Sequence, residues 1–319
     1  MRLDAIIGRG GMSTVWRGRD IAMDRPVAVK VLSADFASSA ADREQFFNEA
    51  RVMTRVQHPG IVHAYDLNCA NGLYYIVMEL VEGYTFAQRV SQKGPIPEED
   101  ALIIAESVSV ALGHAWNQYR VVHCDIKPEN LMIHSDGTVK VADLGLCRSR
   151  GMHSGAMRED EVIGTPGYIS PEQVYGDVAL DARADIYSLG ASLYQLTTGH
   201  MLFEGRSNDD MLRAHVDASQ AVDPRLYAER LSGPFAALLA HMTVKDRDQR
   251  YADWDAVLKD VGLVAAGRFP SPVPAAAVSS IRLQSDARQA PPPPPAASSR
   301  VRTLKTHKRS GPVLTIRRK

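Results

Sequence analysis

Hydrophobic positions divide the chain into a strand-like front part and a helical back part. Three apolar runs near the N-terminus are rich in β-branched and aromatic residues and predict β-strands: residues 27–32, 60–67 and 73–80. Between the first two runs, Phe46, Ala50 and Met53 recur at helical spacing and predict one helix over about residues 42–56. The front part is therefore expected to be a β-rich unit with a single helix.

After Gly83 the apolar residues recur with a helical period. One stripe contains Ala101, Ala105, Val108, Leu112 and Ala115, and Pro97 is predicted to lie in the first turn of that helix. A second stripe contains Ile186, Leu189, Leu193 and Leu196. Two more helices are expected near residues 234–242 and 252–264. The back part is expected to be mainly helical.

From Gly267 onward the pattern changes in kind. This tail is rich in Pro, Ala and Ser, contains five consecutive prolines at residues 291–295, and ends in basic residues. With almost no aromatic content it is predicted to be disordered, with a short polyproline II segment. From Arg268 to the end there are 11 Lys and Arg against one acid, which leaves 26 basic and 36 acidic residues in the rest. A net charge of zero thus conceals a basic tail and an acidic body.

Composition narrows the class of protein. The chain has 319 residues, of which 45% are hydrophobic, enough for a sizeable core. It has no apolar run of membrane-spanning length and no basic-then-apolar leader, so we expect neither a membrane span nor a secretory signal, and a cytoplasmic location. Three cysteines without metal-ligand spacing argue against a disulfide framework and fit a reducing compartment.

A glycine-rich turn near the N-terminus gains meaning from the residues downstream of it. The segment GRGGMSTV runs from Gly8 to Val15, and taken alone a tight hairpin explains it equally well. Lys30 comes next in a V-A-V-K strand, and Glu49 lies on the single early helix. Glycines let backbone N–H groups approach phosphate oxygens, a strand lysine adds positive charge, and a helix carboxylate can hold that lysine.

A second group of polar residues lies in the segment VVHCDIKPENLMI, residues 121–133. Asp125 is suited to accept a proton from an attacking hydroxyl, and Lys127 to meet a transferred phosphoryl group. Asn130 and, further along, Asp143 in VADLGL supply hard oxygen ligands for Mg²⁺. Judged singly, each of these residues could be an ordinary surface charge, so the assignment depends on their order along the chain.

In that order the sequence resembles the eukaryotic-like (Hanks-type) serine/threonine protein kinases, most closely those of bacteria, from Met1 to about Val264. The resemblance rests on the glycine loop, the strand lysine, the helix Glu, H-x-D-x-K-x-x-N, D-x-G, and S-P-E in place of A-P-E. It implies an α+β, two-lobed kinase fold with a small antiparallel β lobe over residues 1–80 and a mainly helical lobe over 81–266. The tail, residues 267–319, lies outside the resemblance.

The resemblance also implies a role for each matched residue. ATP with Mg²⁺, or with Mn²⁺ in its place, would bind between the lobes. The implied catalytic residues are Asp125 as base, Lys127, and the pair Lys30 and Glu49, while Asn130 and Asp143 would hold the metal. Those implied to bind the nucleotide are Gly8, Gly10, Gly11, Val15, Ala28, Met78 as gatekeeper, Glu79, Val81 and Met132. Thr165 with Lys127 fits the serine/threonine-specific pattern, and Glu172 with Arg250 would anchor the activation segment.

Three positions depart from the family pattern. Ser13 replaces the third loop glycine, which is expected to restrict the backbone there, and Leu144 replaces a phenylalanine. Cys124 stands where most relatives have the arginine that pairs with a phosphate on the activation segment. We therefore expect activity without phosphate on Ser149 or Ser154. Arg148 is the alternative phosphate receiver, and a redox role for Cys124 with Cys147 is a less favoured interpretation.

Two other classes of function remain open from sequence alone. One is an ATP-binding pseudokinase scaffold, against which the retention of Lys30, Glu49, Asp125, Asn130 and Asp143 argues. The other is an adaptor whose basic tail binds nucleic acid or anionic lipid, while the tail could equally dock on the acidic kinase domain or be a simple linker. The tail has Ser and Thr beside basic residues, such as Thr303 and Thr306, so autophosphorylation there is expected. The protein substrates would carry Ser or Thr.

Overall fold

The computed structural model describes residues 1–272, apart from 12, 145–163, 178, 206 and 222; the remaining residues and the side chains of residues 41, 45 and 49 are outside the description. Disorder was predicted for residues 267–319, of which 273–319 lie outside the described residues; residues 267–272 are placed, and Ser271 among them donates its backbone N–H to Asp260. The expectations for Ser149 and Ser154 also concern residues outside the description.

The front part is an antiparallel sheet with two helices against it. Its five strands are β1 (Arg2–Arg9), β2 (Ser13–Asp20), β3 (Arg25–Leu32), β4 (Ala64–Ala70) and β5 (Leu73–Met78). They pair in the order β1-β2-β3-β5-β4. Two helices, α1 (Ala34–Ser38) and α2 (Ala40–Arg55), connect β3 to β4. The predicted helix is α2, which begins where the Ser39 hydroxyl accepts a hydrogen bond from the backbone N–H of Asp42.

The strand expected over residues 60–67 is shorter and begins later than predicted, because β4 starts at Ala64. Before it, the chain turns at Gly60, whose backbone N–H donates to Nδ1 of His58 at 3.0 Å. A side chain at Gly60 would come within 3.1 Å of Ala111. Ile61 instead forms an isolated bridge with Val141 of the back part. The apolar run is therefore shared between a crossing segment and a strand, which its composition does not distinguish.

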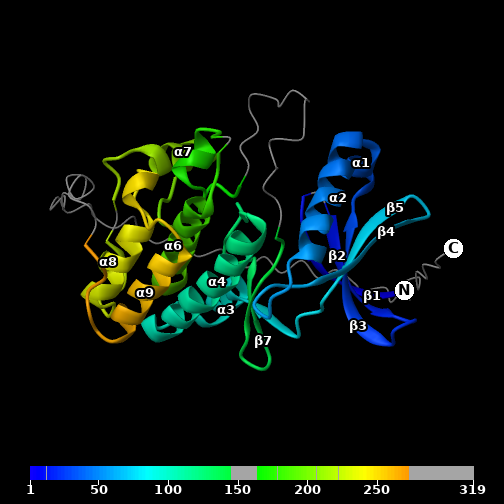
Figure 1. The fold of residues 1–319 in the computed structure, drawn as a ribbon, viewed down its shortest axis with the longest axis horizontal. Coiled ribbons are helices and arrows are strands. Elements are labelled where there is room, and N and C mark those ends of the chain that lie inside the picture. Colours follow the sequence, from blue (N-terminus) through cyan, green and yellow to red (C-terminus); the bar gives the residue numbers. More distant parts are fainter. Residues whose placement is uncertain (12, 145–163, 178, 206, 222, 273–319) are drawn as a thin grey trace, which may run out of the picture.

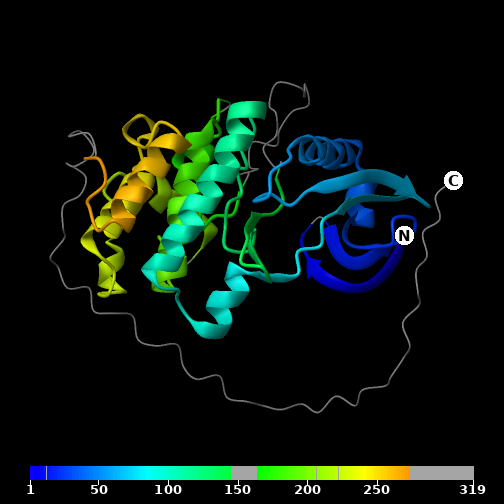
Figure 2. The ribbon, with the colours of Figure 1, turned by 60° about the horizontal axis from the view of Figure 1, so that its bottom comes forward.

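The back part is helical, with a small sheet at the side that faces the front part (Figures 1 and 2). The small sheet contains β6 (Gly83–Thr85), β7 (Leu131–His134) and β8 (Val139–Val141). The helices are α3 (Phe86–Lys93), α4 (Glu98–Tyr119), α5 (Pro171–Val174), α6 (Ala182–Thr198), α7 (Asn208–Val216), α8 (Gly233–Met242) and α9 (Trp254–Ala265), with 3₁₀ turns at Pro224–Leu226 and Arg247–Gln249. The expected α+β, two-lobed architecture is confirmed.

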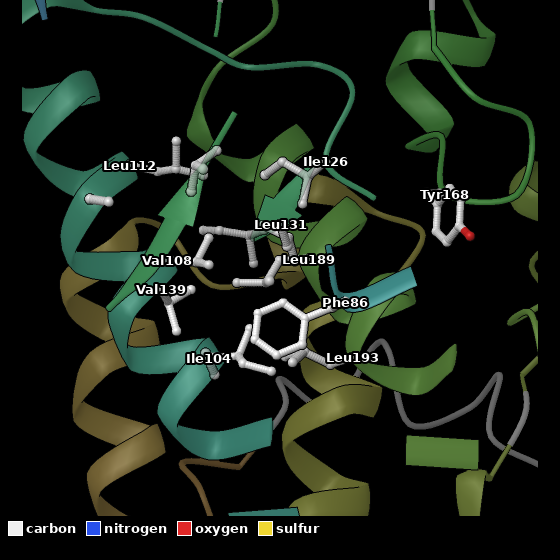
Figure 3. Close-up of a cluster of buried hydrophobic side chains, with 14 of the residues drawn as sticks. Phe86, Ile104, Val108, Leu112, Ile126, Leu131, Val139, Tyr168, Leu189 and Leu193 are labelled. Atoms are coloured by element: carbon white, nitrogen blue, oxygen red, sulfur yellow. The ribbon is translucent and has the colours of Figure 1, made fainter. Parts of the chain in front are cut away.

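The predicted apolar stripes form the core of the back part. Figure 3 shows α4, α6 and the small sheet meeting around Val108, Leu112, Leu131, Leu189 and Leu193, and all five are at most 2% exposed. Apolar burial of this kind contributes about 25 cal/mol per Å² removed from water. Pro97 is the exception to the prediction, because it lies at the N-cap and α4 starts at Glu98. The core holds the ends of the small sheet, from which the polar residues of the site project.

Candidate active site

The glycine turn joins β1 to β2 at the edge of the sheet. The backbone N–H of Gly10 donates to the carbonyl of Ser13 at 2.9 Å, and a side chain added at Gly11 would meet nothing within 4 Å. Gly8 lies directly opposite Val15 across the two strands. Ser13 is the first residue of β2 and pairs with Leu32 in extended backbone. Such backbone suits any residue, so the restriction expected from Ser13 has no structural counterpart.

A lysine from the sheet meets an aspartate from the back part. Lys30 lies on β3 and is 7% exposed, and its Nζ donates to Oδ1 of Asp143 at 3.1 Å. The positive charge of Lys30 is the main reason that the pKa of Asp143 lies below its usual range, despite the burial of that carboxyl. Asp143 is therefore ionised at neutral pH. The predicted convergence of Lys30 and Asp143 is present.

Glu49, the expected partner of Lys30, is on α2 as predicted. Its side chain falls outside the described part of the structure, so a pair between Lys30 and Glu49 stays a prediction.

Asp125, Lys127, Asn130 and Thr165 form one connected hydrogen-bond network. Lys127 Nζ donates to Asp125 Oδ2 at 2.6 Å and to the Thr165 hydroxyl at 2.7 Å. The Thr165 hydroxyl donates to Asp125 Oδ1 at 2.7 Å, and Asn130 Nδ2 donates to Asp125 Oδ2 at 3.2 Å. Residues far apart in sequence thus surround one carboxylate.

Two buried side chains hold the backbone that carries Asp125. The carboxylate of Asp185, on α6, accepts the backbone N–H of His123 at 2.7 Å and that of Cys124 at 2.8 Å. His123 Nδ1 accepts the Asp125 N–H at 3.3 Å, so Nε2 carries the ring proton and donates to the Ala142 carbonyl at 2.9 Å. These contacts give His123 a structural role, because its ring links the backbone of Asp125 to that of Ala142.

Burial raises the pKa of the Asp185 carboxyl to about 6, and the two backbone N–H groups oppose that rise. The two oxygens of this carboxyl accept one backbone N–H each.

The residues expected to surround adenine lie where the sheet meets the small sheet. Ala28 pairs with Met78 across β3 and β5, and both are buried. Val15 and Val81 pack partly buried against the same apolar cluster, and Met132 lies half-buried on β7. These apolar surfaces come from both parts of the molecule.

The side chain of Glu79 has a role that the sequence did not suggest. Its carboxylate pairs with Lys140 of β8 at 2.8 Å and accepts the His63 N–H at 3.4 Å. Lys140 also donates to the carbonyl of Pro59 at 2.8 Å. These contacts connect the segment after β5 to both the front part and the back part.

Glu172 and Arg250 form a buried ion pair. Two nitrogens of the Arg250 guanidinium donate to the two carboxylate oxygens of Glu172, at 2.8 and 3.2 Å. The residues are 6% and 4% exposed. Arg250 also donates to backbone carbonyls of Arg183 and Val244. The predicted anchor between α5 and the turn after α8 is thus present as a contact.

The backbone at Cys124 is unusual. Its φ is 64°, in the left-handed region, and Gln173 Nε2 donates to its carbonyl at 2.8 Å. Cys69 is a free, exposed thiol. Cys147, Arg148, Ser149 and Ser154 lie outside the described residues, so the redox and activation-segment expectations stay predictions.

Sequence reasoning missed the contribution of α6 to the site. The segment DIYSLG, which contains Asp185, comes after the matched motifs, but its pattern assigns no role to the aspartate. The available signal was an acidic residue inside an otherwise apolar helix, because a buried carboxylate requires hydrogen-bond donors.

The oxygen atoms that the site offers as metal ligands fit Mg²⁺. Asn130 uses its Nδ2 on Asp125, with a second bond at 2.8 Å to the Asp125 carbonyl, which leaves its amide oxygen as an acceptor. Asp143 supplies an ionised carboxylate. Among the described residues no group of three or more His, Cys, Asp or Glu could hold a metal alone. Two hard oxygen ligands completed by substrate phosphates are typical of Mg²⁺ in phosphoryl-transfer sites.

A β-sheet lysine joined to an aspartate of a helical lobe, beside an Asp–Lys–Thr–Asn network, defines the protein kinase class. Comparison with known proteins agrees: the model of the protein kinase domain family matches residues 1–261. The chain belongs to this family, and the relatives that it matches are named serine/threonine-protein kinases of bacteria.

Relatives and solved structures support this assignment. The chain is 37% identical over 272 residues to serine/threonine-protein kinase PknB of Mycobacterium leprae, covering 84% of this chain and 43% of that protein. It is 35% identical over 246 residues to serine/threonine-protein kinase PrkC of Bacillus subtilis, covering 77% and 37%. The PknI kinase domain of Mycobacterium tuberculosis has the same fold, with a TM-score of 0.64 at 22% identity over 82% of this chain and 94% of that one.

The chain thus spans less than half the length of the PknB and PrkC proteins that it matches. Among the described residues, no helix is long and apolar enough to cross a membrane.

Proposed function

We propose that the protein transfers the γ-phosphoryl group of ATP to Ser and Thr hydroxyls of proteins. The observation that carries the proposal is the Asp125 carboxylate, bound by Lys127, Thr165 and Asn130 and adjoining the Lys30–Asp143 pair. A base, a positive charge for phosphate and two metal ligands are together what phosphoryl transfer requires.

In this proposal each residue acts at a stated atom. An incoming hydroxyl takes the place of the Thr165 hydroxyl on Asp125 Oδ1 and passes its proton to that carboxylate. Its oxygen forms the new bond to the γ-phosphorus while the bond from that phosphorus to the β,γ-bridging oxygen breaks, and ADP leaves with that oxygen. Lys127 Nζ, already within 2.7 Å of the Thr165 oxygen, adds positive charge where the phosphoryl group moves. Lys30, held in place by Glu49, gives up its contact with Asp143 and binds the α and β phosphates.

Asn130 and Asp143 would hold Mg²⁺, or Mn²⁺ in its place, and the ion would neutralise charge on the ATP phosphates. Val15, Ala28 and Met132 would enclose the two faces of adenine. Met78 would be the gatekeeper, and the backbone of Glu79 and Val81 would contact the edge of the base. The glycine turn of Gly8, Gly10 and Gly11 would cover the phosphates, because backbone N–H groups without side chains can approach them closely.

We further propose that activity does not depend on phosphate at Ser149 or Ser154. Cys124 carries no charge and has no N–H fork, so it cannot receive a phosphate as an arginine does. The backbone at Cys124 is instead fixed by Asp185 and Gln173 without any modification. These two hydrogen bonds support the proposal, because they fix the backbone next to Asp125 without a phosphate.

The deciding experiment measures labelled-phosphate transfer from ATP to a protein acceptor, with the modified sites mapped. Asp125→Asn should lower transfer by at least about 100-fold, because it removes the proton acceptor, while nucleotide binding is retained. Ser149→Ala with Ser154→Ala should stay within about twofold of the unmodified chain. Nucleotide binding without any transfer by the unmodified chain would favour the pseudokinase alternative and overturn the proposal.

The tail is proposed to be both an autophosphorylation substrate and a docking segment. Its 11 basic residues against one acid complement the acidic body. Thr303 and Thr306 lie beside basic residues, and each phosphate there would add about −1.5 to −2 charge. A cytoplasmic location is proposed from the need for ATP. Binding of the tail to nucleic acid or anionic lipid is the competing assignment.

A further inference from the structure

A hollow lies between α4 and α9 and contains none of the active-site residues. One face of α4 contributes Glu99, Ile103 and Glu106, and one face of α9 contributes Leu258 and Gly262. Both views of the fold show the two helices side by side (Figures 1 and 2). We name this hollow the α4–α9 groove.

The floor of the α4–α9 groove is apolar and open. Ile103 is 55% exposed, although large aliphatic side chains are usually covered. Leu102 and Val261 lie beneath it at 8% and 3% exposure. A side chain added at Gly262 would meet nothing within 4 Å. The groove can therefore accept apolar side chains without displacing any atom of the chain.

The rim of the α4–α9 groove is acidic. Glu99 and Glu106 line it together with apolar residues and glycine, and no Lys or Arg is among the described residues that line it. Asp100 adds negative charge to the first turn of α4, whereas the Glu98 carboxylate accepts hydrogen bonds from Ser232 at the start of α8. An occupant that suits this groove combines aliphatic side chains with adjacent positive charges.

We propose that the α4–α9 groove binds residues 313–319 of this same chain. That segment reads VLTIRRK: Val313, Leu314 and Ile316 are aliphatic, and Arg317 to Lys319 are basic. The aliphatic residues would lie over Ile103 and Gly262, and the basic ones would face Glu99 and Glu106. This inference deepens the tail docking proposed above by naming its surface and its segment.

The start of the tail is already fastened to α9. Asp260 of α9 is 1% exposed and accepts the Ser271 backbone N–H at 2.8 Å and the Ser271 hydroxyl at 2.9 Å. Asp260 is next to Val261, which lines the groove. The tail therefore leaves the domain from one of the two helices that form the groove.

The length of the tail allows the contact. About forty residues separate Ser271 from Val313, and a flexible chain of that length spans roughly 30–40 Å on average. α9, with 12 residues, is only about 18 Å long at the helical rise per residue. A tethered segment of this kind has an effective concentration on the order of millimolar, so weak binding suffices for occupancy.

The test places a photo-activated benzophenone amino acid at Ile103 in the full-length chain, without ATP, and maps the crosslinked peptide by mass spectrometry. The expected product is an intramolecular crosslink to residues 313–319. Replacing Leu314 and Ile316 by Glu should lower its yield at least about tenfold, because both substitutions remove aliphatic surface from the contact and add charge that the acidic rim repels.

The second part of the test reverses charges on the groove and on the tail. Glu99→Lys with Glu106→Lys should lower the yield several-fold, and adding Arg317→Glu with Arg318→Glu should restore part of it. Glu229→Lys, at an exposed acid that does not line the groove, is the matched control and should change nothing.

Three results overturn the inference. They are a crosslink that maps elsewhere, a crosslink that joins two copies in a mixture of isotopically labelled and unlabelled chains, and a yield unchanged by the tail substitutions. If the Ile103 variant does not fold, the same amino acid at Ala265, which also lines the groove, gives the same outcomes. Because the readout needs no phosphoryl transfer, failure here is distinguishable from failure of the proposed kinase activity.

Discussion

At the residue scale, the site depends on two non-glycine residues in left-handed backbone. Cys124 has φ 64° and Asp143 has φ 57°. Each such conformation costs on the order of 1–3 kcal/mol and persists only where its surroundings hold it. Asp185 and Gln173 hold Cys124, and Lys30 holds the side chain of Asp143. The strained positions are thus next to the proposed base and at the proposed metal ligand.

Asp185→Asn tests the support beneath the catalytic loop. The side-chain amide of Asn has one oxygen, which accepts, and one NH₂ group, which only donates. One of the two backbone N–H groups would therefore meet an NH₂ group in place of an acceptor. We expect kcat to fall about 10- to 100-fold through misplacement of Asp125, with KM for ATP nearly unchanged. Steady-state kinetics measures both.

The matched control for that variant is Asp181→Asn, at the N-cap of the same helix. Asn is as good an N-cap as Asp, so this change should leave kcat within about twofold. Equal losses in the two variants would show that Asp185 has no special role in the site.

A second residue-scale prediction concerns pH and Lys245. Burial, with the nearby charge of Arg250, lowers the pKa of Lys245 to about 7. In the unfolded chain this lysine stays protonated up to about pH 10. Between pH 7 and 10 the unfolded state therefore binds more protons, and the contribution of Lys245 to stability rises with pH and is lost as pH falls toward 7.

Urea unfolding at several pH values measures this effect. The stability difference between the unmodified chain and Lys245→Met should rise by roughly 2–3 kcal/mol from pH 7 to pH 9, at about 1.4 kcal/mol per pH unit. Lys259→Met, on an exposed position of α9, is the control. A pH-independent difference for Lys245→Met would contradict the prediction.

At the scale of elements, the sequence predicted most helices because their stripes are long and periodic. Residues 46, 50 and 53 of α2 and the leucines of α6 are buried as expected. The prediction for residues 60–67 held only from Ala64 onward, because a crossing segment and a strand are both apolar. α1, with five residues, and the short strands of the small sheet are too brief for a periodic signal. Tertiary contacts fix those elements.

The sequence also identified the order of the site residues, but not what holds them. Lys30, Asp125, Asn130 and Asp143 carry recognisable motifs. The support from Asp185, Gln173 and the Glu79–Lys140 pair comes from contacts between segments far apart in the chain. No local pattern encodes such contacts, so they could not be derived from one sequence.

The ion pair between α5 and the turn after α8 allows a stability prediction at this scale. Glu172→Gln leaves the Arg250 guanidinium buried without its counter-charge, which should cost about 3–5 kcal/mol of unfolding free energy. Urea denaturation measures the loss. Asp4→Asn removes half of the exposed pair between Arg2 and Asp4 and should change stability by less than about 1 kcal/mol. Similar losses in both would argue against a structural role for the buried pair.

At the scale of the whole molecule, charge is separated along the chain. The tail after Gly267 has 11 basic residues and one acid, whereas the rest of the chain has ten more acids than bases. Attraction between exposed charges is screened over about 10 Å at 0.1 M salt and about 3 Å at 1 M. The overall dimensions of the full-length chain should therefore respond to ionic strength.

Small-angle scattering at low and high salt tests this expectation. If the tail docks, the radius of gyration should rise as salt increases from about 0.05 to 1 M, because screening releases the tail. A variant with Glu in place of Arg317, Arg318 and Lys319 should already be expanded at low salt. An identical radius for both chains under all conditions would mean that the terminal charges do not contribute to compaction.

The contact between Asp260 and Ser271 determines where the domain can be shortened. Asp260 also accepts the Tyr251 hydroxyl at 2.8 Å, so three donors satisfy one carboxylate that has almost no access to water. Ending the chain at residue 266 would delete two of those donors and uncover the carboxylate, whereas ending it after Pro272 would keep them. Loss of activity in the shorter fragment would then reflect an opened α9, and only the longer fragment can report on the tail itself.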